Sequence, residues 1–307
     1  MRHRICLVGQ KGGQMTGVTK GVLLPVITPF VGGKVDITTY KKLLLHYLSK
    51  GIHGLVPLGT TGESPTIEED EYNRIVEATI EVAKDKVPIY VGVSGNSTRK
   101  VIDQMNSLNS YDITGYLVTS PYYNLPSQQG IFDHFAMLAD STDKQILIYN
   151  IPYRTGRNVE NETILRLSKI PNIVGIKDSS GIVSQSIELL RERHPRFAVF
   201  TGEDILFYFN IVSGGNGGIL ASAHLQTDRF VRVWESVQEI DLKTALMEWN
   251  KLTKMIPLLF TEPNPAPIKY ILAKKGIIAS PELRPPMGTI SEHLKSELDR
   301  FMSEQAI

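Results

Sequence analysis

Lys177 is the residue of this sequence with the clearest chemical potential. It closes an apolar run at residues 172–177 (Asn-Ile-Val-Gly-Ile-Lys), which is typical of a buried strand. Burial disfavours the charged form of an amine, and a neutral amine can attack a ketone to form a Schiff base. A lysine at a strand end can also extend its amine into water, so Lys177 alone leaves both interpretations open.

Polar side chains also follow three other predicted strands. They are Thr60 with Thr61, Tyr122 with Tyr123, and Tyr149 with Arg154. Backbone N–H groups beside two hydroxyls suit a small carboxylate, a phenol near an amine can move protons, and a guanidinium fits a second carboxylate. Each feature also has a structural explanation, as a capping turn, as aromatic packing or as surface charge. Their joint occurrence at strand ends favours a shared site.

A scaffold must bring these strand ends together. Apolar segments alternate with amphipathic ones, and several strands are uniformly apolar, as in sheets buried on both faces. The predicted strands are 22–27, 54–58, 88–93, 115–119, 145–149, 173–176, 198–201 and 217–220. The predicted helices between them are 37–49, 68–84, 99–109, 130–141, 161–167, 184–193 and 205–213, and a further helix over 225–239 follows the last strand. This α/β pattern predicts a (β/α)₈ TIM barrel, whose catalytic groups lie at the carboxyl ends of the strands.

A doubly wound open sheet is the alternative fold. Residues 27–30 (Ile-Thr-Pro-Phe) stand where its glycine-rich turn would follow the first strand, which favours the barrel. We expect the barrel over residues 18–240, with Asp36 as the N-cap of its first helix. A C-terminal helical appendix over 241–307 should pack on it, with helices near 242–259, 265–275 and 291–304. Residues 1–17 are interpreted as a disordered or artefactual leader, with Met15 as a candidate start.

Composition argues against several classes of protein. The 307 residues include 33 basic and 32 acidic side chains without a basic tract, which disfavours nucleic-acid and membrane-surface binding. No apolar stretch approaches the ~20 residues of a membrane span. The single cysteine, Cys6, excludes an internal disulfide, and no Cys/His cluster has zinc-ligand spacing. We expect a cytoplasmic protein with no metal site.

Several motifs together resemble the dihydrodipicolinate synthase / N-acetylneuraminate lyase superfamily. They are Gly-Thr-Thr-Gly-Glu at 59–63, Pro-Tyr-Tyr-Asn at 121–124, Tyr-Asn-Ile-Pro-Tyr-Arg-Thr-Gly at 149–156, Gly-Ile-Lys at 175–177, Glu-Pro-Asn-Pro at 262–265 and Leu-Arg-Pro-Pro-Met at 283–287. The resemblance covers about residue 20 to the C terminus. Arg154, followed by Thr-Gly, is most similar to the dihydrodipicolinate synthase branch.

The resemblance implies a Schiff-base aldolase. Lys177 would form an imine with pyruvate, while Thr60, Tyr149 and Tyr123 would relay protons. Tyr123 would reach into the site of a neighbouring subunit, because family members are commonly homotetramers built as dimers of dimers. The same assembly is therefore expected here. The covalent pyruvate imine on Lys177 would take the place of a cofactor.

Substrate binding would involve Thr61 for the pyruvate carboxylate, Arg154 for the carboxylate of the incoming aldehyde, and Ile219. The implied reaction condenses pyruvate with L-aspartate 4-semialdehyde to 4-hydroxy-tetrahydrodipicolinate, in lysine and diaminopimelate biosynthesis. One alternative is another pyruvate-dependent lyase or aldolase acting on 2-keto-3-deoxy sugar acids, since nucleophile and fold do not determine the second substrate. Another is a non-catalytic barrel that binds a keto acid.

The resemblance also bears on regulation. Members inhibited by lysine bind it at a dimer interface through histidines and a glutamate. Asn96 and Tyr122 match that pocket, but Glu69 and Tyr72 stand at the histidine positions and Lys100 at that of the glutamate. A cation at Lys100 would repel the ammonium groups of lysine, so we expect insensitivity to L-lysine.

Overall fold

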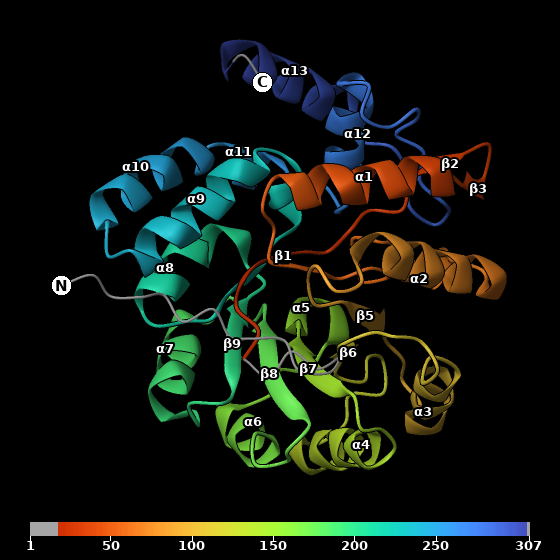
Figure 1. Ribbon diagram of the computed structural model, residues 1–307, viewed down its shortest axis with the longest axis vertical. Coiled ribbons are helices and arrows are strands. Elements are labelled where there is room, and N and C mark those ends of the chain that lie inside the picture. The colour runs from red at the N-terminus through yellow and green to blue at the C-terminus, as the bar shows by residue number, and fades with distance from the viewer. Residues whose placement is uncertain (1–17, 306–307) are drawn as a thin grey trace.

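The protein, described here by a computed structural model over residues 18–305, contains eight parallel strands in one sheet. They are β1 (Gly21–Leu24), β4 (Gly54–Leu55), β5 (Tyr90–Val93), β6 (Gly115–Thr119), β7 (Gln145–Asn150), β8 (Ile173–Asp178), β9 (Ala198–Thr201) and β10 (Gly217–Ile219). Their order is β4-β1-β10-β9-β8-β7-β6-β5, and a bridge from Leu55 to Ile89 joins β4 to the start of β5. The sheet therefore closes, and the predicted barrel is confirmed (Figure 1). The predicted leader lies outside the described residues.

Helices surround the strands, as Figure 1 shows. They are α1 (Ile37–Ser49), α2 (Glu69–Ala83), α3 (Thr98–Ser107), α4 (Gln128–Asp140), α6 (Asn161–Leu167), α7 (Val183–Glu192), α8 (Phe207–Val212) and α9 (Thr227–Gln238). They match the predicted segments apart from small differences at the ends. Asp36 caps α1 as predicted, because its side chain accepts the Thr39 N–H at 3.0 Å. Across residues 18–305, no helix combines the length and apolar character needed to cross a bilayer.

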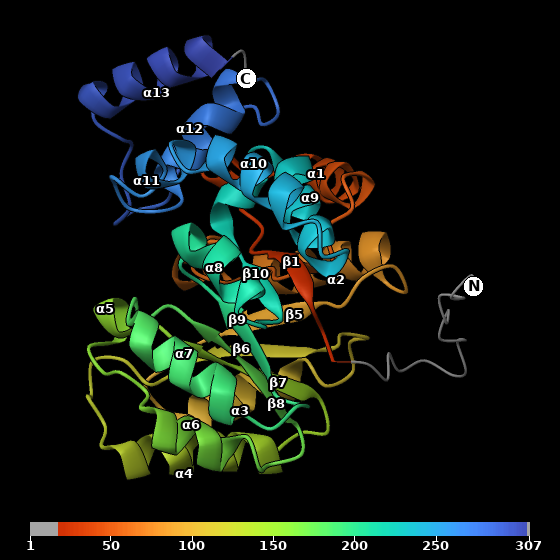
Figure 2. The ribbon, with the colours of Figure 1, turned by 90° about the vertical axis from the view of Figure 1, so that its left-hand side faces the viewer.

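Four further helices follow α9. They are α10 (Leu242–Leu252), α11 (Met255–Leu258), α12 (Ala266–Lys274) and α13 (Glu292–Gln305). The prediction of one helix over 242–259 is wrong, because Pro257 has no N–H to donate back to residue 253 and the chain turns between α10 and α11. Figures 1 and 2 both show α12 and α13 outside the ring of barrel helices, beyond α1.

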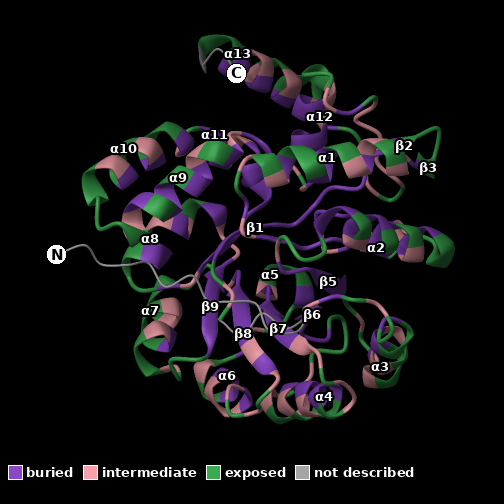
Figure 3. Cartoon of the chain, in the orientation of Figure 1, coloured by how far each residue is buried: buried purple, intermediate pink, exposed green. Residues whose placement is uncertain are grey.

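The alternation of side chains along the strands divides the core into two layers. Leu147 and Tyr149 of β7 belong to the cluster inside the barrel, whereas Ile146 and Ile148 pack outward against the helices. The strands are accordingly buried and the outer faces of the helices exposed (Figure 3). Tyr149 is the last inward-facing residue of β7, so its side chain lies at the carboxyl mouth of the barrel.

Several short elements were not predicted. A hairpin joins β2 (Phe30–Val31) to β3 (Lys34–Val35), a 3₁₀ turn η1 spans Ser64–Thr66, and a one-turn helix α5 spans Pro152–Thr155. Segments of two to four residues are too short to show a hydrophobic period, which explains why the sequence pattern did not reveal them.

Candidate active site

Adjacent strands place the side chains of Lys177 and Tyr149 together. These two residues are paired in the parallel register of β7 and β8, so both point into the barrel at the same level. The Lys177 Nζ lies 4.1 Å from the centroid of the Tyr149 ring. Only 6% of Lys177 and 5% of Tyr149 is exposed. The amine is therefore held against a phenol inside the barrel mouth and does not extend into bulk water.

The Thr60–Thr61 turn follows β4. The Glu63 N–H donates to the Thr60 carbonyl at 3.1 Å, which folds the turn back on itself. Asn264, just before α12, donates from its side-chain amide to the Thr61 hydroxyl at 2.9 Å. Thr61 is buried whereas Thr60 is partly exposed, and both residues line the cavity described below.

Arg154 is carried by α5, directly after β7. Pro152 stands at the start of this helix, where its fixed φ is favourable. Gly156 ends it in the left-handed conformation (φ 76°) and donates to the Pro152 carbonyl at 2.8 Å. The single turn places the exposed guanidinium of Arg154 at the rim of the mouth.

A cavity of about 630 Å³ opens at this mouth, a volume suited to a small metabolite. Six residues predicted from the sequence line it, namely Lys177, Tyr149, Thr60, Thr61, Arg154 and Ile219. The cavity thus combines an amine beside a phenol with groups that can bind carboxylates at two places. This arrangement suits imine chemistry on a keto acid with a second charged substrate.

Tyr123 does not line this cavity. Its side chain is 86% exposed, and its backbone is left-handed (φ 71°), a costly conformation for a bulky residue. Tyr122 and Leu125 of the same loop are also exposed. Within one chain, Tyr123 is separate from the other candidate catalytic residues.

Sequence reasoning missed two acidic residues of the cavity wall, Glu203 and Asp204, which directly follow β9. Burial, together with the negative charge of Asp204, raises the pKa of Glu203 to about 7. Burial also raises the pKa of Asp204 to about 6, although this carboxylate accepts the Ser222 N–H at 2.7 Å and its hydroxyl. The rule that strand ends carry functional groups would have found both residues if it had been applied to β9.

The C-terminal region supplies another wall. Ile256, Phe260, Glu262 and Asn264 line the cavity, and they lie in or near α11 and the segment before α12. The motif at 262–265 was noticed in the sequence, but no role was assigned to it. Barrel strand ends and the C-terminal region therefore build the cavity together.

Gly202, at the end of β9, lies against the stem of Lys177. A Cβ atom placed on Gly202 would lie 2.5 Å from the Lys177 Cε and 2.1 Å from the Ser179 Oγ. Contacts this short do not occur between real atoms, so only glycine leaves the present path of the Lys177 side chain free.

Between residues 18 and 305, no group of three His, Cys, Asp or Glu side chains is arranged to hold a metal ion. The His224 ring instead accepts the Ile27 N–H at 3.1 Å in the core.

Comparison with known proteins places the chain in a family. Residues 18–305 match the model of the dihydrodipicolinate synthetase family. A relative named 4-hydroxy-tetrahydrodipicolinate synthase 2, from Clostridium acetobutylicum, is 52% identical over 92% of this chain and 99% of its own length. A dihydrodipicolinate synthase structure from Thermotoga maritima has a TM-score of 0.91 at 32% identity, covering 94% of this chain and 99% of that one. The chloride-inhibited dihydrodipicolinate synthase from Acinetobacter baumannii, complexed with pyruvate, also has a TM-score of 0.91, at 30% identity over 94% of this chain and 99% of that one. The chain belongs to the dihydrodipicolinate synthetase family.

Proposed function

We propose that this protein is a class I aldolase that condenses pyruvate with L-aspartate 4-semialdehyde to 4-hydroxy-tetrahydrodipicolinate. The observation that carries the proposal is the buried Lys177 amine, 4.1 Å from the centroid of the Tyr149 ring, in a cavity with Thr61 and Arg154. The names of the similar proteins support this second substrate over the aldehydes of 2-keto-3-deoxy sugar acids. The reaction belongs to lysine and diaminopimelate biosynthesis, which supports a cytoplasmic location.

The first half-reaction forms a nucleophile from pyruvate. The neutral Lys177 amine attacks the pyruvate C2, and loss of the ketone oxygen as water leaves a protonated imine. This cation accepts the electron pair released when a C3 proton leaves, so the product is an enamine. Tyr149, whose ring lies beside the amine, would take and return protons, with Thr60 as the next group of the relay; their shared cavity supports these roles. Thr61 and the N–H groups of its turn hold the pyruvate carboxylate.

The second half-reaction joins the substrates. The enamine C3 attacks the aldehyde carbon, and the resulting alkoxide takes a proton from the relay. The amino group of the second substrate then attacks the imine carbon and displaces the Lys177 amine, which closes the ring. Arg154 binds the carboxylate of this substrate at the rim, and correct placement lowers the barrier to the bond-forming step. Because the imine itself is the electron sink, the proposed mechanism requires no cofactor or metal.

The assembly we propose is a homotetramer, built as a dimer of dimers. Two apolar surfaces on each chain support it. One is the loop of Tyr122, Tyr123 and Leu125. The other, which we call the α7/α8 face, consists of Ile182, Val183, Ile187, Phe209 and Val212. Exposed apolar surfaces of this kind are typical of subunit interfaces, and a tetramer of this symmetry needs at least two. Tyr123 would then complete the proton relay of the neighbouring subunit.

Borohydride reduction tests the nucleophile. Pyruvate and borohydride should together add one reduced pyruvyl group, and peptide mapping should find it on Lys177. The variant Lys177→Ala should take up none. Absence of the adduct in the wild-type protein would remove both aldolase interpretations and favour a binding protein.

A panel of aldehydes tests the second substrate. Aspartate semialdehyde should support pyruvate consumption far better than sugar aldehydes do. Arg154→Ala should lower this activity while leaving the borohydride adduct intact. Arg157→Ala is the matched control, because Arg157 is a nearby exposed arginine that does not line the cavity. Equal loss of activity with all aldehydes would contradict the role of Arg154.

A further inference from the structure

The Thr60–Thr61 turn ends in a buried ion pair with the C-terminal region. Glu63 has a left-handed backbone (φ 56°), and its carboxylate pairs with the ammonium of Lys269 in α12. The Lys269 side chain is fully buried and that of Glu63 nearly so. The same ammonium donates to the Glu282 carbonyl at 2.8 Å and lies 4.1 Å from the centroid of the Phe30 ring. Each charge therefore has specific partners in the interior.

Stability alone does not explain this pair. Burial raises the pKa of Glu63 and lowers that of Lys269, and the opposite charge of the partner counteracts each shift. Apolar residues of similar volume usually stabilise a fold as well as a buried ion pair does. What such a pair adds is a defined position for both side chains. Here that position is three residues beyond Thr60 and two beyond Thr61.

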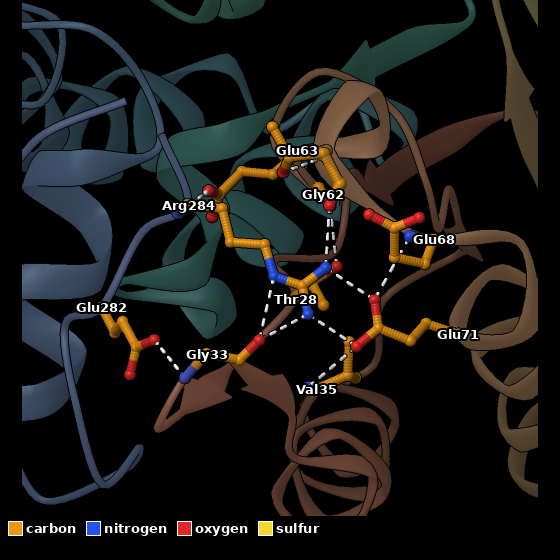
Figure 4. Close-up of polar contacts among 10 residues, drawn as sticks. Thr28, Gly33, Val35, Gly62, Glu63, Glu68, Glu71, Glu282 and Arg284 are labelled. Carbon is orange, nitrogen blue, oxygen red and sulfur yellow. Dashed lines mark hydrogen bonds and ion pairs between the residues drawn. The ribbon is translucent and has the colours of Figure 1, made fainter. Parts of the chain in front are cut away.

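A second contact from the C-terminal region fastens the same segment. Figure 4 shows the Arg284 side chain reaching the Glu71 carboxylate, with two hydrogen bonds of 2.6 Å each. The guanidinium also donates to the Thr66 carbonyl at 2.7 Å and to the Gly33 carbonyl. The Arg284 backbone N–H donates to the second carboxylate oxygen of Glu63 at 3.3 Å. Arg284 thus joins η1, the start of α2 and Glu63.

The turn is held on further sides as well. Asn264 donates to the Thr61 hydroxyl, as described above, and Thr28 donates from its hydroxyl to the Gly62 carbonyl at 2.7 Å (Figure 4). A Cβ atom on Gly62 would lie 3.0 Å from the Val26 carbonyl oxygen, so the turn fits closely against the segment that follows β1. These contacts restrict movement of the turn relative to the residues around it.

We infer that Lys269 is a positioning residue of the pyruvate site, which acts through Glu63 on the hydroxyl and backbone donors of the Thr60–Thr61 turn. Asn264 and Arg284 assist it. The inference rests on the proposed function and deepens it, because it makes affinity for the keto-acid carboxylate depend on the C-terminal region. The charges involved do not touch substrate. They set the place of the groups that do.

The double variant Glu63→Gln/Lys269→Met tests this inference, because it removes the ion pair without leaving either charge buried alone. The measurement is borohydride trapping on Lys177 at increasing pyruvate concentration. Half-saturation should require about tenfold more pyruvate than in the wild-type protein, whereas trapping at saturation should reach the same extent. A purely structural role would instead lower the amount of trappable protein and leave the half-saturating concentration unchanged.

The matched control is Lys274→Met in the same helix. Lys274 pairs with Asp299 at 2.5 Å, but that ion pair is exposed and distant in sequence from the turn, so half-saturation should not change. If the double variant does not fold, Glu63→Gln alone keeps one acceptor oxygen, which can still bind the Lys269 ammonium, and should show a smaller rise. An unchanged half-saturating concentration in the folded variant would overturn the inference, as would failure of both variants to fold. Absence of trapping in the wild-type protein would instead refute the proposed function.

Discussion

Replacement of Gly202 by alanine should lower the activity of the enzyme by displacing the Lys177 amine, which is the proposed nucleophile. The added methyl carbon would lie 2.5 Å from the Lys177 Cε and 2.9 Å from the Lys177 Cγ, so the lysine side chain must move by about 1 Å to reach ordinary contact. Misplacement of a reacting group by this distance can lower a rate about 100-fold. We therefore expect kcat/KM to fall by about 100-fold, which corresponds to about 2.7 kcal/mol.

The assay combines steady-state pyruvate consumption with the rate of borohydride trapping, and both should fall together. The Gly202 backbone lies outside the left-handed region, so an alanine causes no backbone strain there and the effect is steric. Gly288→Ala is the matched control. Among residues 18–305, no heavy atom lies within 4 Å of a Cβ placed on Gly288, and activity should stay near the wild-type value.

The contact with Ser179 can be separated from the contact with Lys177. The double variant Gly202→Ala/Ser179→Gly removes the clash with the Ser179 Oγ at 2.1 Å but keeps both contacts with the lysine. Activity should therefore remain low. Recovery in the double variant, or a folded Gly202→Ala enzyme within threefold of the wild type, would refute the reasoning.

Three other predictions concern charge, assembly and regulation. The pKa of Glu203 is raised to about 7 in the folded protein, so the protein loses stability as pH rises from 4.5 to about 7 and this carboxyl group ionises. Glu203→Gln should therefore raise the free energy of unfolding at pH 8 by about 1–2 kcal/mol, after allowance for solvent screening. At pH 4.5 the same variant should change it little, and urea unfolding measures both values. Ile187→Glu on the α7/α8 face should reduce the proposed tetramer to dimers in light-scattering measurements, whereas a tetramer of unchanged mass would exclude this face from the interface. L-Lysine should not inhibit the enzyme at concentrations up to about 1 mM, because the exposed Lys100 repels its ammonium groups. Half-maximal inhibition below that concentration would contradict this prediction.

The barrel was predictable from sequence because its strands carry a strong local signal. Runs such as residues 173–176 are apolar throughout, and the helices between them show a clear period, so element types follow without tertiary information. The strand-end rule then brought Lys177, Tyr149, Thr60 and Arg154 to one mouth, where the structure also has them. Tyr149 lies beside Lys177 because the two residues are paired in the parallel register of the neighbouring strands β7 and β8.

The parts that could not be predicted depend on contacts distant in sequence. The acidic residues at the start of α2 suit the positive end of the helix dipole, but Glu71 also binds Arg284, more than two hundred residues away. Nothing local marks Lys269 as buried, because its partner Glu63 lies in another part of the chain. The missed acid Glu203 is a different case, since its position after β9 was visible in the sequence.

The ion pair between Glu63, after the Thr60–Thr61 turn, and Lys269 of α12 affects when the pocket can form during synthesis of the chain. As the polypeptide leaves the ribosome, the segment with Glu63 emerges long before the lysine that neutralises it. The keto-acid pocket can therefore reach its working shape only after α12 has been translated and has left the ribosome. A nascent chain without α12 would carry Lys177 in an incomplete pocket.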